Sequence, residues 1–200
     1  MPSEPVAVRE RIIQEATRLF VTHGYHGISM REIAKVVGVS KAGLYYHFQD
    51  KQELLLAILT DSLEHIERLI QEARQEGTTA REQIGQAMQA IFSLAPERRA
   101  IIRLASQEMA HLNPTTRAAF RQRYYDKFVG QIADILRSGM EQGELRVMDV
   151  RLATWMLLGM MYPFLYPAHE RELGVPETAI ELMLTIFFHG AARESAPQSS

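Results

Sequence analysis

Apolar residues recur at intervals of three and four along almost the whole chain, which is the pattern of helices with one buried face. No run alternates apolar and polar residues between turn signals, so no strand is expected. Besides two short helices described next, the predicted helices are Val8–His23, Lys51–Glu76, Thr79–Leu94, Pro96–Ala110, Asn113–Gly143, Asp149–Tyr166 and Pro176–Gly190. Residues 1–7 are expected to form a loose arm. The pattern predicts an all-α fold of about nine helices.

Two short helical patterns meet at a turn near the N-terminus. Ser29 and Glu32 have the spacing of a capping box, which begins the first helix. Gly38 can take the left-handed conformation that ends it. Val39 follows to pack between the helices, and Ser40 can cap the second helix. This arrangement is typical of a helix-turn-helix.

The second of these helices has an unusual outer surface. Its expected inward residues are Ala42, Leu44 and Phe48. The residues expected to face solvent are small or carry hydroxyl, cationic or imidazole groups: Ser40, Lys41, Gly43, Tyr45, Tyr46 and His47. Such side chains approach DNA closely and bind phosphates and base edges. Asp50 and Glu53 then cap a third helix, whose first residue, Lys51, lies where the helix dipole favours a phosphate.

The stretch from Ser29 to Leu55, SMREIAKVVGVSKAGLYYHFQDKQELL, resembles the DNA-binding signature of the tetracycline-repressor family of bacterial transcription regulators. The match spans most of the family's N-terminal domain. The resemblance implies that Gly38 shapes the turn, and the expected DNA-binding residues are Ser29, Met30, Arg31, Ser40, Lys41, Ala42, Gly43, Tyr45, Tyr46, His47 and Lys51. The expected function is that of a repressor, released from a palindromic DNA operator by a small molecule.

The expected domains are a three-helix head with the helix-turn-helix, residues 1–50, and a helical ligand-binding and dimerisation domain, residues 51–194, followed by a frayed tail, residues 195–200. The predicted helix Lys51–Glu76 would span roughly 39 Å and could act as a lever between the domains. Residues 1–51 hold seven Lys and Arg against five Asp and Glu, whereas residues 52–200 hold 15 against 19. This small asymmetry has the sign of a nucleic-acid-binding head on an acidic body.

The last two predicted helices are apolar on more than one face. A helix that is apolar all round must be covered all round, and a second copy of the chain is the simplest cover. The resemblance implies the same pair of helices for dimerisation. We therefore expect a homodimer whose interface includes Met160, Met161, Leu184, Phe187 and Phe188.

The ten methionines and the aromatic residues of the larger domain have two interpretations. Most are expected to pack in the core, but Met-rich, aromatic interiors also admit apolar ligands. A cavity for a small hydrophobic effector is expected among Met88, Phe92, Gln107, Met109, His111, Tyr124, Phe128, Trp155 and Tyr162.

Other classes of function find less support in the sequence. Glu108 and His111 have the spacing of half a di-metal site, but no second pair occurs, so no metal and no cofactor are expected. The chain has no cysteine, nucleophile elbow or phosphate-binding loop, which argues against an enzyme. An α-helical protein-binding adaptor would explain the apolar C-terminal helices but not the tyrosine-rich recognition helix. The sequence has no signal peptide and its longest apolar run is short for a membrane span, so we expect a cytoplasmic protein without membrane contact.

Overall fold

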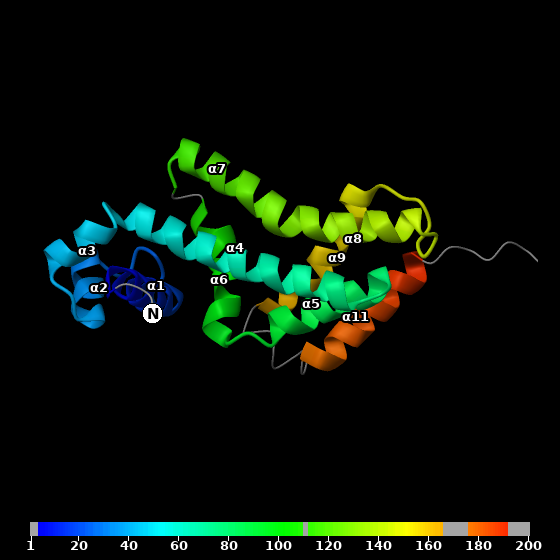
Figure 1. Ribbon diagram of the computed structural model, residues 1–200, viewed down its shortest axis with the longest axis horizontal. Helices are drawn as coiled ribbons and strands as arrows, with labels where there is room; N and C mark the ends of the chain where they lie inside the picture. Colours follow the sequence, from blue (N-terminus) through cyan, green and yellow to red (C-terminus); the bar gives the residue numbers. More distant parts are fainter. Residues whose placement is uncertain (1–3, 110–111, 166–175, 192–200) are drawn as a thin grey trace, which may run out of the picture. The chain divides into compact units, whose positions relative to one another are not determined.

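The computed structural model describes residues 4–109, 112–165 and 176–191 (Figure 1). The predicted all-α fold class is confirmed, because these residues form helices and turns and no β-strand. Contacts group the chain into two compact units. The first unit combines Met1–Glu64 with Ala95–Gln122, and the second combines His65–Leu94 with Arg123–Ser200. Each unit is therefore built from two separate stretches of sequence, a grouping that differs from the single boundary expected after residue 50.

The head at the start of the first unit consists of α1 (Glu4–His23), α2 (Met30–Val37) and α3 (Lys41–His47). Helix α2 packs against both α1 and α3 (Figure 1). The core of this head consists of fully buried side chains of all three helices and the residue after them, including Ile12, Ala16, Phe20, Ile33, Leu44 and Phe48. Because α1 begins at Glu4, the loose arm predicted for residues 1–7 is wrong from that residue onward. Pro5 does not prevent this, since proline is tolerated in the first turn of a helix.

The caps that separate these helices follow the sequence pattern. The Ser29 hydroxyl accepts a hydrogen bond from the Glu32 backbone N–H, and the Ser29 N–H donates to the Glu32 carboxylate over 2.8 Å. Gly38 ends α2 with φ of 76°, a left-handed conformation that favours glycine. The Gly43 N–H donates to the Ser40 hydroxyl over 2.9 Å. The helix-turn-helix geometry is thus fixed by short-range hydrogen bonds.

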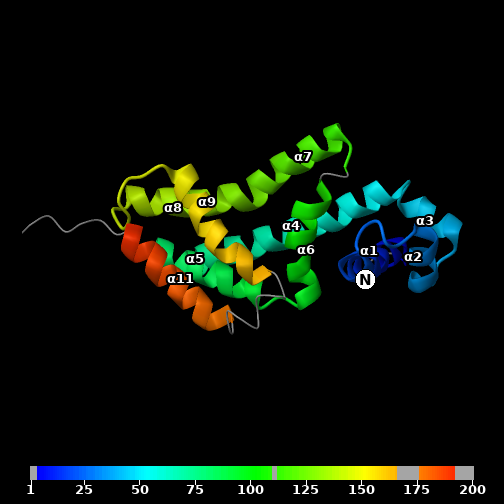
Figure 2. The ribbon, with the colours of Figure 1, turned by 180° about the vertical axis from the view of Figure 1, so that it is seen from behind.

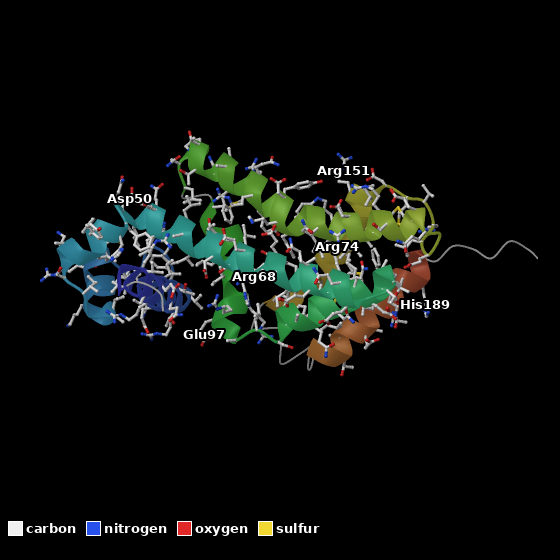
Figure 3. All side chains as sticks on the ribbon, in the orientation of Figure 1. Asp50, Arg68, Arg74, Glu97, Arg151 and His189 are labelled. Atoms are coloured by element: carbon white, nitrogen blue, oxygen red, sulfur yellow. The ribbon has the colours of Figure 1, made fainter. Side chains whose placement is uncertain are left out.

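Helix α4 (Lys51–Glu76) has the bounds predicted from the sequence, and the division between the two units falls within it, after Glu64. Asp50 lies at its N-terminal end, and Arg74 lies near its other end (Figure 3). The Asp50 carboxylate accepts the Glu53 N–H over 2.8 Å, but the Glu53 carboxylate accepts from Gln49 rather than from Asp50.

The remainder of the first unit is α6 (Pro96–Glu108) and most of α7 (Pro114–Tyr124). Helix α6 packs against α1. An ion pair of 3.3 Å between Arg98 and Asp61 joins α6 to the first part of α4. Two hydrogen bonds of 3.4 Å from Asn113 to the Gln52 side chain hold the residue before α7 near the start of α4.

The second unit is a helical bundle. In it α5 (Ala80–Phe92) lies beside α11 (Pro176–Ala191) and α8 (Gly130–Glu141), and α8 lies beside α9 (Val150–Met161) (Figures 1 and 2). A π-helical turn, Tyr125–Val129, interrupts the helix predicted from Asn113 to Gly143. The α-helix that Asp149 caps ends at Met161 and continues as a 3₁₀ turn, Tyr162–Leu165, because Pro163 has no N–H for a further α-helical bond.

Two polar contacts join the second part of α4 to the segment around the π-helical turn. The Lys127 ammonium and the Glu67 carboxylate form an ion pair, with both side chains partly buried. The Arg74 guanidinium donates to the Gln131 side chain over 3.1 Å. Among the helices of the described residues, none is long and apolar enough to cross a lipid bilayer.

Candidate DNA-binding site and ligand region

The head carries a shallow surface hollow where three helices and a loop meet. Its lining comes from the α1–α2 loop, α2, α3 and the first residue of α4: His26, Gly27, Ile28, Ser29, Met30, Arg31, Glu32, Lys41, Tyr45 and Lys51. Six of these residues belong to the set expected from the sequence to bind DNA. The fold therefore brings residues from three parts of the sequence onto one surface that carries several cations.

Helix α3 presents its aromatic and cationic side chains to solvent. Leu44 and Phe48 anchor it and are almost fully buried, whereas Tyr46 is 82% exposed. The Lys41 ammonium lies 5.8 Å from the centroid of the Tyr45 ring, and the rings of Tyr46 and His47 meet edge to face at 5.2 Å. This surface therefore presents aromatic rings and hydrogen-bonding groups to solvent. No helix among the described residues of the same unit covers it.

Two side chains of the expected DNA-binding surface lie differently from the prediction. Ala42, expected to point inward, is exposed, because only Leu44 and Phe48, four residues apart, share the inner face of this short helix. That position leaves Ala42 on the outer face, where its role as a DNA-binding residue stays a prediction. Met30 is buried in the head, so a DNA contact there would have to come from its backbone.

Lys51 is held by aromatic rings. Its ammonium lies 4.5 Å from the centroid of the Tyr25 ring and 5.8 Å from that of Phe20. Tyr25 is itself buried, with its ring edge against Phe20. Cation–π contact restrains the lysine while it still lines the hollow.

Glu32 places a carboxylate beside the cations of the hollow. The Ser29 hydroxyl and backbone N–H both donate to it, and these hydrogen bonds hold the pKa of the Glu32 carboxyl below its ordinary value. The negative charge of Glu32 therefore serves to cap α2. His26 and Gly27, which were not among the expected DNA-binding residues, lie in the loop before this cap and also line the hollow. Their position depends on tertiary folding, so no local pattern identified them.

The residues expected to bind an effector fall into three groups. Met88, Phe92 and Phe128 are buried, Met109 is half-buried, and Tyr124 meets the Phe128 ring edge to face at 5.5 Å. Burial, together with the nearby Tyr162, raises the pKa of the Tyr124 hydroxyl to about 12. The side chain of Gln107 and the whole of His111 lie outside the described residues.

Trp155 and Tyr162 form the third group and correct the prediction of an interior position. Trp155 is 50% exposed and Tyr162 is 37% exposed in the single chain. Both lie where α9 and the following turn reach the surface. Because α9 is apolar on all sides, its sequence could not show which side faces the core of the chain. Trp155 lies on the side that faces away from that core.

Three of the five expected dimer-interface residues are buried within the single chain. Leu184 and Phe188 are buried in the chain's own fold, as is Met161. Leu184 packs so closely on α5 that a Cβ atom added at Gly85 would lie 3.0 Å from it. Met160 and Phe187 are half-buried. The outer apolar face of these two helices consists instead of Leu152, Trp155, Met156, Leu182 and Ile186, each at least half exposed.

No group of three potential metal-ligating side chains occurs among the residues that the structure describes. The Glu108 side chain and His111, which have the spacing of half a di-metal site, lie outside the described residues.

Two family models match this chain. Residues 12–58 match the model of bacterial regulatory proteins of the tetR family, and residues 77–163 match the model of the tetracyclin repressor-like C-terminal domain. The first match contains most of α1, the whole helix-turn-helix and the start of α4, and the second contains α5 to α9.

Curated relatives agree with these models. The chain is 25% identical to the fatty acid metabolism regulator protein of Bacillus subtilis over 150 residues, which cover 74% of this chain and 77% of that protein. It is 25% identical to the transcriptional repressor KstR2 of Mycolicibacterium smegmatis over 90% of this chain and 92% of that one.

Two solved structures share the fold over nearly their full length. The TetR family transcriptional regulator PfmR from Thermus thermophilus is 28% identical, with a TM-score of 0.77 over 92% of this chain and 100% of that chain. AibR, solved in complex with isovaleryl coenzyme A and operator DNA, is 26% identical, with a TM-score of 0.75 over 90% of this chain and 98% of that chain. With a matched DNA-binding model, a matched C-terminal model and full-length fold agreement, the chain belongs to the tetracycline-repressor family of bacterial transcription regulators.

Proposed function

We propose that this regulator is a homodimeric repressor that binds a palindromic operator and is released from it by a small, mostly apolar effector. The observation that carries the proposal is the outer face of α3. Lys41, Tyr45 and Tyr46 are exposed there, while Leu44 fixes the helix to the core. A purely structural helix of seven residues has no reason to expose aromatic rings, whereas a recognition helix uses them for bases and phosphates.

The proposed operator geometry follows from the size of a DNA turn. Two heads of a dimer would occupy successive major grooves, which requires recognition helices about 34–36 Å apart. An effector that favours a different spacing would release the protein. By thermodynamic linkage, DNA must then weaken effector binding by the same factor.

The dimer itself is proposed to form through the outer apolar face of α9 and α11, the set Leu152, Trp155, Met156, Leu182 and Ile186. These side chains lie at i, i+3 and i+4 on α9 and at i and i+4 on α11, spacings that place each group on one face of its helix, and the two helices contact each other. An isologous contact would bring the same face from both copies together. Such a dimer would act in the cytoplasm, where chromosomal DNA is found.

The proposed effector is an acyl thioester of coenzyme A or another apolar molecule with a polar end. AibR, one of the similar structures, was solved with isovaleryl coenzyme A, and a curated relative is named a fatty acid metabolism regulator. In this chain the buried Phe128 ring packs against the Tyr124 ring at 5.5 Å, and this pair, which combines apolar rings with one hydroxyl, supports a site of that kind.

Transmission from effector to DNA is proposed to run through α4. Its first part belongs to the unit that contains the head, and its second part carries Glu67 and Arg74, which bind Lys127 and Gln131. A ligand that moves the segment around the π-helical turn would thereby act on α4.

The test is fluorescence anisotropy with an operator obtained by selection from random-sequence DNA. The proposal predicts a palindromic selected site, and weaker binding when isovaleryl coenzyme A or a longer acyl thioester is added but not with free coenzyme A. Selection of no common sequence would contradict the DNA-binding proposal. Operator binding that none of these thioesters changes would contradict the effector proposal alone.

A further inference from the structure

The hollow on the head contains one histidine to which no role has been assigned, His26. It lies in the loop between α1 and α2, and in the hollow it lies beside six expected DNA-binding residues. Its side chain is exposed. A loop histidine that shares a hollow with recognition residues is placed to touch the same ligand as they do.

Two features fix the position of His26. Its ring meets the Tyr25 ring edge to face at 5.0 Å, and Tyr25 is buried against Phe20. At Gly27 an added Cβ atom would lie 2.1 Å from the His23 carbonyl oxygen, so the loop returns so close to the end of α1 that only glycine fits. The imidazole is therefore supported by the core on one side and by a constrained loop on the other.

The charge of the hollow suits an anion. Arg31, Lys41 and Lys51 line it against one carboxylate, that of Glu32. That carboxylate already accepts hydrogen bonds of 2.8 and 2.6 Å from Ser29. Cations supplied by α2, α3 and α4 thus outnumber the carboxylate, which itself serves as a cap.

We infer that this hollow seats one phosphodiester group of the operator backbone and that the His26 ring donates a hydrogen bond to it. This inference rests on the proposed DNA-binding function. A protonated imidazole makes a stronger, charge-assisted hydrogen bond to phosphate than a neutral one, so this contact strengthens as pH falls through the range in which histidine titrates.

The charged groups that line the hollow together with His26 are Arg31, Lys41, Lys51 and Glu32. The head holds two other histidines, His23 and His47. His23 acts electrostatically on Glu32, and neither histidine lines the hollow. His23 is therefore the matched control for His26, because it lies outside the hollow and outside the set expected to bind DNA.

The experiment measures affinity for the selected operator near pH 6 and near pH 8 with wild type, His26→Gln and the matched control His23→Gln. We expect His26→Gln to lose about tenfold in affinity near pH 6 and less than about twofold near pH 8. Near pH 6 the slope of log affinity against log salt should also decrease by about 0.9. His23→Gln should keep the wild-type values.

A second measurement uses the wild-type protein alone, so it does not depend on the folding of a variant. Each operator phosphate is replaced in turn by an uncharged methylphosphonate. At one position per half-site this replacement should remove most of the pH dependence of wild-type binding.

The outcomes separate the two proposals. Specific operator binding by wild type with the same pH dependence in His26→Gln, or without any methylphosphonate position that reduces it, would overturn the phosphate seat only. Absence of specific binding by wild type would overturn the DNA-binding function on which the seat depends.

Discussion

The Lys51 ammonium lies 4.5 Å from the centroid of the buried Tyr25 ring, at the point where α4 begins beside the hollow of the head. The ring restrains a long, flexible side chain that would otherwise lose conformational entropy on binding phosphate. In the proposed DNA-binding role of Lys51, Tyr25 would support phosphate contact without itself lining the hollow. A buried residue of the head, Tyr25, thus helps to position the Lys51 ammonium.

Lys51→Ala is expected to weaken binding to all DNA sequences alike. Loss of one phosphate contact should reduce the salt slope by about 0.9, with no change in sequence preference. Anisotropy titrations at several salt concentrations measure this slope. Lys35→Ala is the matched control, because Lys35 is exposed on α2 but does not line the hollow. Equal salt slopes for Lys51→Ala and wild type would contradict the assignment.

Tyr25→Leu should reproduce part of the effect of Lys51→Ala while leaving Lys51 in place. It removes the ring under the ammonium, so binding should weaken about two- to fivefold beyond any loss explained by stability, in keeping with a cation–π contact of about 0.5–1 kcal/mol. A double-mutant cycle of the two changes measures the coupling. Full additivity would mean that the ring does not position Lys51.

Charges on the outer face of α9 and α11 should prevent dimer formation. Leu152→Glu and Ile186→Glu place carboxylates among exposed apolar side chains, so each should give a folded monomer with much weaker operator binding. Val147→Glu is the control, because Val147 is an exposed apolar residue outside this face. Sedimentation velocity measures the state of assembly. A dimer that persists in both face variants would contradict the proposed interface.

Leu184→Glu and Phe188→Glu should behave differently from the face variants. Both side chains are buried in the chain's own core, so a charge there should destabilise the fold by about 3–5 kcal/mol instead of producing a stable monomer. Thermal unfolding followed by circular dichroism separates the two results. A folded monomer from Leu184→Glu would show that this residue lies at the dimer interface after all.

Tyr124 makes a prediction about alkaline pH. Burial and the nearby Tyr162 raise the pKa of its hydroxyl to about 12, so between about pH 10 and about pH 12 the folded chain binds more protons than the unfolded chain. The stabilisation is fully present below about pH 10 and is lost as pH rises, by about 2–3 kcal/mol in total. Tyr124→Phe should show a smaller decrease in its free energy of unfolding over this range. Identical decreases in both proteins would argue that Tyr124 is more exposed in solution.

Sequence patterns predicted the features of this fold that depend on near neighbours. The bounds of α4, the capping box at Ser29 and the turn at Gly38 all follow from hydrogen bonds within a few residues. Local patterns also identified the exposed surface of α3, since polar and aromatic residues there have no place in a core.

Features that depend on tertiary packing could not be predicted from the sequence pattern. Leu184 and Leu182 are equally apolar, and only the position of α5 decides that the first is buried and the second exposed. The π-helical turn at Tyr125–Val129 leaves no signal in the spacing of apolar residues. His26 reaches the hollow because a loop folds back at Gly27, which a helical pattern cannot show.

Titration of wild-type protein into its selected operator and into a scrambled duplex of equal length measures sequence-specific binding by a dimer. We expect two protomers to bind each palindrome with a Kd of about 10⁻⁸ M or tighter at physiological salt, at least about 10³-fold tighter than for the scrambled duplex. Equal affinity for the two duplexes, or one protomer bound per palindrome, would contradict this expectation.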